Sequence, residues 1–218
     1  MTIFNGKFEQ PIFIISLDTE LIWGIVHTDV DASLLINDKK QCRGAIDTLL
    51  NIFEKHNIPA TWAVVGHLFL DHCEKEDGIP HRSMPRFKDD WYSCDPCTDI
   101  QRDPLFYGKD IIEKILSSSV RHEIGYHSFS HVIFSECIRE VAEAEIKEGI
   151  KLAKEFGVTL KSFVFPQDKI GHLDILKENG FRIYRSRIFK RGNMNQRVPI
   201  RKFNGAIDLM YLFSYPVF

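Results

Sequence analysis

Short apolar runs alternate with amphipathic segments along most of this chain, and that alternation limits its fold more than any other feature. Strands that alternate with helices form a parallel sheet joined by right-handed crossovers, so we expect an α/β fold. The runs that predict strands are 11–17, 60–66, 121–126, 162–165 and 181–184, and the helical segments are 41–56, 67–74, 108–117, 135–156 and 172–179.

The ends of these predicted strands carry polar or special residues. Asp18, Gly66, His127 and Pro166 each follow such a run. Side chains that carry chemistry gather at the carboxyl ends of parallel strands, so we expect these positions to share one site. The first run, residues 11–17, is continuous and rich in Ile, which is typical of a strand buried on both faces.

His127 and His131 are the first candidates for metal ligands. They are spaced i and i+4 after a predicted strand. Two histidines with this spacing on one helical turn can direct both rings at one ion. We therefore predict a helical turn that presents two imidazoles.

Asp18 and Glu20 are the acidic counterpart of this pair. Residues i and i+2 of a strand point to the same side, so both carboxylates can face the cavity while Thr19 turns away. One carboxylate can bind a metal while the other accepts a proton from water. Two histidines, one carboxylate and an open position form a common catalytic zinc set.

Composition limits the class of protein. The chain has 218 residues, 44% hydrophobic and 27% charged, which predicts a single globular domain over residues 1–218. A net charge of −2 gives no reason to expect a nucleic-acid partner. The first apolar run is too short to span a bilayer and lacks a signal-peptide layout, so we expect no transmembrane segment and a cytoplasmic location.

The five cysteines do not suggest a disulfide framework, because their number is odd. Cys94 and Cys97 form a CxxC inside a long irregular insertion, residues 77–104, and no second CxxC completes a zinc site. We interpret the pair as reduced cysteines in a turn, with a redox or metal role as the alternative. His67, His122 and His172 are predicted to be structural or exposed.

Three blocks together give the chain a family likeness. They are Ser16–Gly24, Glu123–His131 and Phe163–Gln167, supported by 58–66 and 177–185. In this combination the sequence resembles the NodB-type polysaccharide deacetylases, carbohydrate esterase family four, in the branch whose first motif reads aspartate, any residue, acid. The likeness spans roughly residues 11–187.

The resemblance implies a distorted (β/α) barrel, a divalent metal that is most often zinc, and removal of an N-acetyl group from an amino sugar. By position, Glu20, His127 and His131 correspond to metal ligands, and Asp18 corresponds to the catalytic base. The backbone N–H of Gln167 corresponds to the donor that stabilises the oxyanion.

Departures from the family pattern concern the third motif and the C-terminal end. Phe163 and Phe165 stand where the family carries an arginine that orients the base, and Gln167 replaces a common aromatic. The family's catalytic acid is a late histidine, whereas the last histidine here is His172. We therefore expect a barrel that is incomplete at the C-terminus, with acid catalysis from another group or with weak or no activity.

Further residues are candidates for substrate contacts. They are Trp23, Trp62, Pro166 and Arg185, although either Trp can instead be core packing. Eight Lys and Arg residues and no acid lie within 181–205. This segment predicts a site for a nucleotide- or lipid-phosphate-linked sugar or an acidic membrane surface, or else a solvated loop. The apolar residues 211–218 suggest an oligomer contact or a missing C-terminal segment that covers them.

The sequence thus supports a metal-dependent hydrolase that removes an N-acetyl group from an amino sugar during surface-polysaccharide or glycoconjugate biosynthesis. The alternative is a catalytically impaired or truncated relative that binds a metal, a saccharide or a partner protein. A metal-dependent amidase for a non-sugar amide is a third hypothesis, since the same barrel permits it.

Overall fold

The main sheet of the described residues is parallel throughout, as the alternation of strands and helices predicts. A computed structural model describes residues 13–28, 39–88 and 90–185. Its five-stranded sheet has the order β1-β2-β5-β6-β7, and every neighbouring pair is parallel. The strands are β1 (Ser16–Thr19), β2 (Thr61–Val64), β5 (Glu123–Tyr126), β6 (Ser162–Val164) and β7 (Ile183–Arg185).

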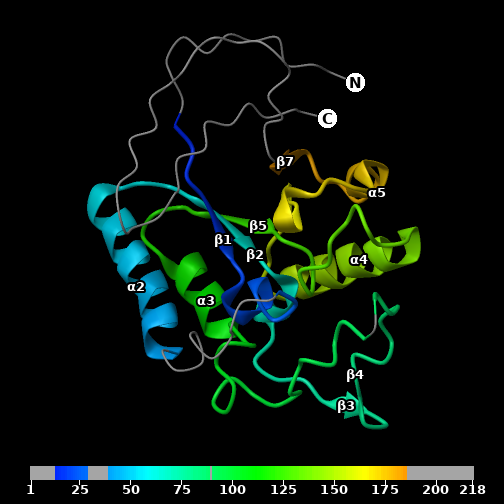
Figure 1. Ribbon diagram of the computed structural model, residues 1–218. Helices are drawn as coiled ribbons and strands as arrows, with labels where there is room; N and C mark the ends of the chain where they lie inside the picture. Colours follow the sequence, from blue (N-terminus) through cyan, green and yellow to red (C-terminus); the bar gives the residue numbers. More distant parts are fainter. Residues whose placement is uncertain (1–12, 29–38, 89, 186–218) are drawn as a thin grey trace.

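Helices connect successive strands and lie outside the curled sheet (Figure 1). The architecture is an α/β half-barrel of parallel strands, which is consistent with an incomplete barrel of the predicted type. Each predicted helix after residue 100 is found within a few residues of its expected limits. The helices are α2 (Lys39–His56), α3 (Lys109–Ser117), α4 (Arg139–Glu155) and α5 (Leu173–Glu178).

Short 3-10 turns follow three of the strands, at the edge where the candidate site residues lie. They are η1 (Leu21–Gly24), η2 (Gly66–Phe69) and η3 (Pro166–Asp168). The helix expected over 67–74 is therefore only one short turn. The long segment after it opens with a small antiparallel hairpin, β3 (Lys75–Glu76) and β4 (Ile79–Pro80).

The expectation for the first strand is wrong in its start and in its burial. The strand begins at Ser16, and Phe13 and Ile14 are 71% and 42% exposed. Within the described ranges, β1 pairs with β2 alone and so lies at an edge of the sheet. The two exposed residues precede the strand, so the sheet and its helices do not enclose them.

The core is rich in aromatic side chains, and α4 lies unusually close to the sheet. Tyr126 on β5 is fully buried, and its hydroxyl donates to the Glu145 carbonyl at 2.6 Å. A Cβ atom on Gly149 would lie 1.9 Å from the Tyr126 ring, so only glycine permits this approach. The contact fixes the position of α4, and with it the buried side chain of Glu145.

Candidate metal centre

Glu20, His127 and His131 converge at the carboxyl ends of β1 and β5. Glu20 Oε2 lies 3.2 Å from His127 Nε2 and 3.0 Å from His131 Nε2. One donor atom from each of the three residues lies within 4.8 Å of the others. The two imidazoles are buried, while the Glu20 side chain is 32% exposed. The three residues predicted as ligands therefore form one cluster with an open side.

The two histidines reach this cluster from a loop, so the predicted helical turn is wrong. Residues 127–133 are not helical, and Ser128 and His131 have φ values of 58° and 63°. Left-handed backbone is uncommon for residues other than glycine, and its cost in free energy must be offset by other contacts. The backbone N–H groups of Phe129 and Ser130 supply it, because both donate to Glu145 Oε2, at 2.8 and 2.9 Å.

Glu145 is a buried clamp for this histidine loop (residues 127–131). Its other oxygen, Oε1, accepts hydrogen bonds from Ser130 Oγ and Tyr92 Oη, both at 2.8 Å. Burial raises the pKa of Glu145, although all four hydrogen bonds favour the charged form. Sequence reasoning missed this residue. Its signal was a carboxylate on the apolar stripe of α4, between Ala142 and Gly149.

A carbonyl fixes the orientation of the His127 ring. His127 Nδ1 lies 2.8 Å from the Val164 carbonyl oxygen, which can only accept. Nδ1 therefore carries hydrogen, and Nε2, which faces Glu20, is the atom available to a metal. This is the usual way in which a protein prepares an imidazole ligand.

Burial and charge together shift the pKa values of all three groups. Burial alone would lower the pKa of His127, but hydrogen bonding and charge from Glu20 outweigh it and raise that pKa. Burial dominates at His131 and lowers its pKa. Burial would raise the pKa of Glu20, yet the two imidazoles hold it well below its ordinary value. Glu20 is thus a carboxylate, and His131 is a neutral donor.

Asp18 is paired with Arg185, from the opposite edge of the described sheet. The guanidinium of Arg185 forms an ion pair with Asp18 Oδ1 and also donates to Ser16 Oγ at 2.9 Å. Arg185 is the register partner of Val164, inside the third motif. An arginine therefore stands beside that motif in space, although the motif itself has none. The negative charge of Asp18 acts on both His127 and His131.

The remaining predicted site residues are placed as follows. Trp23 and Trp62 are 0% and 1% exposed and pack in the core, which was the alternative to a substrate contact, so that contact stays a prediction. Arg185 was predicted to bind substrate, whereas here it holds Asp18. Pro166 is buried at the start of η3, and Gln167 has a φ of 54°. The oxyanion role of the Gln167 N–H stays a prediction.

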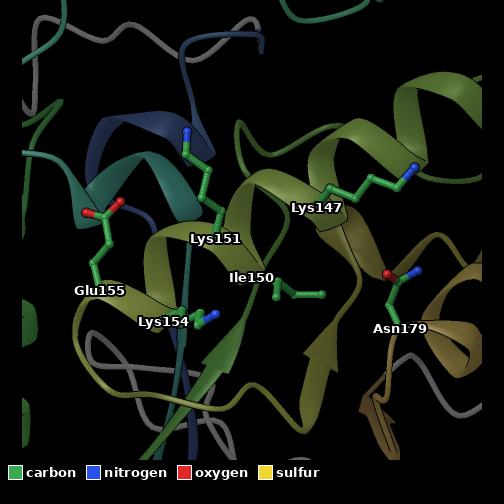
Figure 2. A pocket seen from close by; sticks show the side chains of 6 residues that line it. All are labelled: Lys147, Ile150, Lys151, Lys154, Glu155 and Asn179. Carbon is green, nitrogen blue, oxygen red and sulfur yellow. The ribbon is translucent and has the colours of Figure 1, made fainter.

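A surface hollow of about 570 Å³ lies on the outer side of α4 (Figure 2). Two of its lysines are already paired, Lys147 with Glu143 and Lys151 with Glu148. None of its lining residues belongs to the cluster around Glu20. The lining consists of Lys147, Ile150, Lys151, Lys154, Glu155 and Asn179.

Comparison with known proteins identifies the family. The model of the polysaccharide deacetylase family matches residues 28–183. The chain belongs to the polysaccharide deacetylase family. Among the curated proteins, no sequence matches it significantly.

Three solved structures resemble the chain at low identity. A protein from Mycobacterium smegmatis described as a polysaccharide deacetylase has a TM-score of 0.48 and 18% identity, over 77% of this chain and 48% of its own. The Streptococcus pyogenes deacetylase PplD has a TM-score of 0.42 and 12% identity, over 77% of this chain and 52% of its own. IcaB from Ammonifex degensii has a TM-score of 0.39 and 15% identity, over 62% of this chain and 52% of its own. The chain thus spans about half the length of these structures.

No helix within the described residues is both long enough and apolar enough to cross a bilayer. Most of the basic segment 181–205, and all of the apolar residues 211–218, lie outside the described residues. The expectations for a phosphate-binding surface and for a covered apolar tail are therefore untested.

Proposed function

We propose that this protein is a metal-dependent deacetylase that removes N-acetyl groups from amino sugars. The observation that carries the proposal is the convergence of Glu20 Oε2 on the Nε2 atoms of His127 and His131, at 3.2 and 3.0 Å. Family membership supports a saccharide substrate. The donor set fits zinc, because two imidazoles and one carboxylate are a common set of protein ligands in catalytic zinc sites.

Glu20, His127 and His131 would hold the metal. A zinc ion bound there would polarise the acetyl carbonyl and lower the pKa of the attacking water. The chain's own contribution is to fix the ligands. The Val164 carbonyl orients His127, and the Glu145 carboxylate holds the loop that carries both histidines.

Asp18 is the proposed general base. It is partly exposed, with 37% of its side chain accessible, and its charge acts on both histidine ligands. Arg185 holds one carboxylate oxygen and leaves the other free to accept a proton from water. In the net reaction, water adds to the acetyl carbon, the C–N bond breaks, and the sugar amine leaves with a proton. The Gln167 N–H is the proposed oxyanion donor.

We infer a role in surface-polysaccharide or glycoconjugate assembly, from the saccharide chemistry of the family. We also infer one domain over residues 1–218. A lipid- or nucleotide-linked sugar is the substrate form that the basic segment would suit.

Turnover of an oligomer of N-acetylglucosamine tests the proposal. Zinc-loaded protein should release acetate and free amine in equal amounts. Asp18→Asn should lower kcat about 10²- to 10⁴-fold while the zinc content stays unchanged, since only the base is lost. Asp47→Asn, at an exposed aspartate paired with Lys114, is the matched control and should keep full activity. Zinc-loaded wild-type protein without turnover would favour the alternative, a saccharide-binding relative.

A further inference from the structure

A second cluster of potential metal ligands lies apart from Glu20 and is assembled from η2, the segment that follows it and the long insertion. Its members are His67, Cys73, His81 and Asp95. Asp95 Oδ2 lies 2.8 Å from His67 Nε2, 2.7 Å from His81 Nε2 and 3.5 Å from Cys73 Sγ. The two Nε2 atoms are 3.1 Å apart. Four donors from four separate short segments thus share one small space.

Hydrogen positions leave this cluster short of positive charge. His67 Nδ1 lies 2.9 Å from the carbonyl oxygen of Phe106, which can only accept, so Nδ1 carries the hydrogen. In the neutral ring, Nε2 is then a lone pair, and it faces the Asp95 carboxylate. Two acceptor atoms at 2.8 Å repel each other unless a cation lies between them.

Burial argues against a proton as the cation between His67 and Asp95. The His67 and Asp95 side chains are 0% exposed, and that of His81 is 12% exposed. The Cys73 thiol and the His81 Nε2–H can each donate to Asp95, but the neutral His67 ring cannot, because its hydrogen is on Nδ1. A proton on His67 Nε2 would have to be held in a fully buried ring, where burial lowers the pKa of the imidazole. A divalent ion satisfies all four donors at once.

We propose that His67, Cys73, His81 and Asp95 bind a zinc ion in a closed structural site. Tetrahedral zinc with ordinary bond lengths places its donors roughly 3.3 to 3.6 Å apart. The four spacings given above run from 2.7 to 3.5 Å, and all four donor atoms lie within 4.8 Å of one another, so small side-chain shifts reach this geometry. One thiolate and two imidazoles favour zinc over calcium or magnesium. With four protein donors, no position is left for water, so the role is support rather than catalysis.

The second site would tie the insertion to the histidine loop. His67 N donates to the Phe129 carbonyl at 2.8 Å, and Gly66 N donates to the Ser128 carbonyl at 2.7 Å. From the insertion, Trp91 Nε1 donates to the Ser130 carbonyl at 2.8 Å. Zinc bound to His67 and Asp95 would therefore join the two segments that contact residues 128–130, which are η2 and the insertion. His67 is indeed buried, but the prediction of a purely structural histidine omitted its donor role.

Cobalt substitution distinguishes the two sites, because only the second contains a thiol. Full-length protein loaded with Co²⁺ should show a sulfur-to-cobalt charge-transfer absorption in the near ultraviolet. The band should persist in His131→Ala, which disrupts the cluster around Glu20, and disappear in Cys73→Ser. Cys94→Ser, at a cysteine outside the four donors, is the matched control and should keep the band.

The metal content gives the second measurement. Zinc-saturated His131→Ala should retain about one equivalent per chain, and its thermal midpoint should fall when a chelator removes it. A wild-type cobalt protein without the charge-transfer band would overturn the proposal without any variant. A band that survives Cys73→Ser would overturn it equally. Loss of deacetylase activity alone would bear on the site around Glu20 and not on this one.

Discussion

The two candidate metal-binding clusters differ in donor number and in access to solvent. Glu20, His127 and His131 supply three donors, and the Glu20 side chain is 32% exposed. The cluster around Asp95 supplies four donors, with that carboxylate fully buried. Catalytic zinc sites keep a position for water, and structural sites close around the ion. Donor number and exposure therefore assign different proposed roles to similar residue types.

The two clusters share one device. In each, an imidazole donates its Nδ1–H to a backbone carbonyl, His127 to Val164 and His67 to Phe106. The Nε2 atom is thereby left as a lone pair that faces a carboxylate. The shared tautomer leaves the same ring atom available to a cation in both clusters, so the proposed roles differ through donor number and exposure.

The variant with the largest expected effect is His131→Ala, which tests whether the two clusters bind zinc independently. Deacetylation should fall by at least about 10³-fold, because the metal supplies both carbonyl polarisation and the activated water. Zinc content should drop by one equivalent while the thiol-bearing site keeps its own. Metal analysis and acetate release on the same sample check this. Loss of both ions in a folded variant would contradict the independence of the two sites.

Arg185→Met tests the role of Asp18 beside the open site, the cluster of Glu20, His127 and His131. The change removes the ion pair that orients Asp18 but touches no proposed metal ligand. We expect kcat to fall about 10- to 100-fold with zinc content unchanged, because a displaced base lowers the rate without abolishing it. Steady-state kinetics with metal analysis measures this. Arg182→Met, three residues earlier and before β7, is the control and should leave kcat unchanged.

The outline of both sites was predictable only in part. Strand ends and the spacing of His127 and His131 were enough to predict the cluster with Glu20, because parallel strands place their carboxyl ends together. The conformation of the loop was not predictable, since it depends on a carboxylate from α4 that follows the loop in sequence. The i,i+4 spacing suggested a helix, whereas a loop with two left-handed residues brings both imidazoles to the same place.

The closed cluster escaped prediction for a different reason. Its donors have no regular spacing, and the visible motif, Cys94 and Cys97, contributes neither cysteine to it. Asp95 between them is the donor instead. Arg185 was likewise assigned to substrate, because its pairing with Asp18 requires the register of β7 beside β6. Contacts across distant segments are what a single sequence hides.

Glu145→Gln tests whether the clamp beneath the open site is charged. Four donors point at this carboxylate, and an amide would turn its own N–H₂ toward some of them. We expect the free energy of unfolding to fall by about 2–4 kcal/mol, the range for breaking a buried hydrogen-bonded charge. Chemical denaturation measures it. Glu148→Gln, one turn away in an exposed pair with Lys151, should cost less than about 1 kcal/mol.

The smallest effect is the pH dependence of zinc binding at the open site. In the metal-free protein, Glu20 raises the pKa of His127 above its ordinary 6.5, so protonated His127 stabilises the fold below that pH. This contribution is lost as the pH rises through the raised value, and zinc must displace the same proton. His131, whose pKa is lowered, is already neutral there. Zinc affinity should therefore increase up to about tenfold per pH unit from pH 6 until His127 has lost its proton. Titration of Cys73→Ser, in which only the open site remains, measures this. A flat profile over that interval would show that Glu20 does not hold a proton on His127.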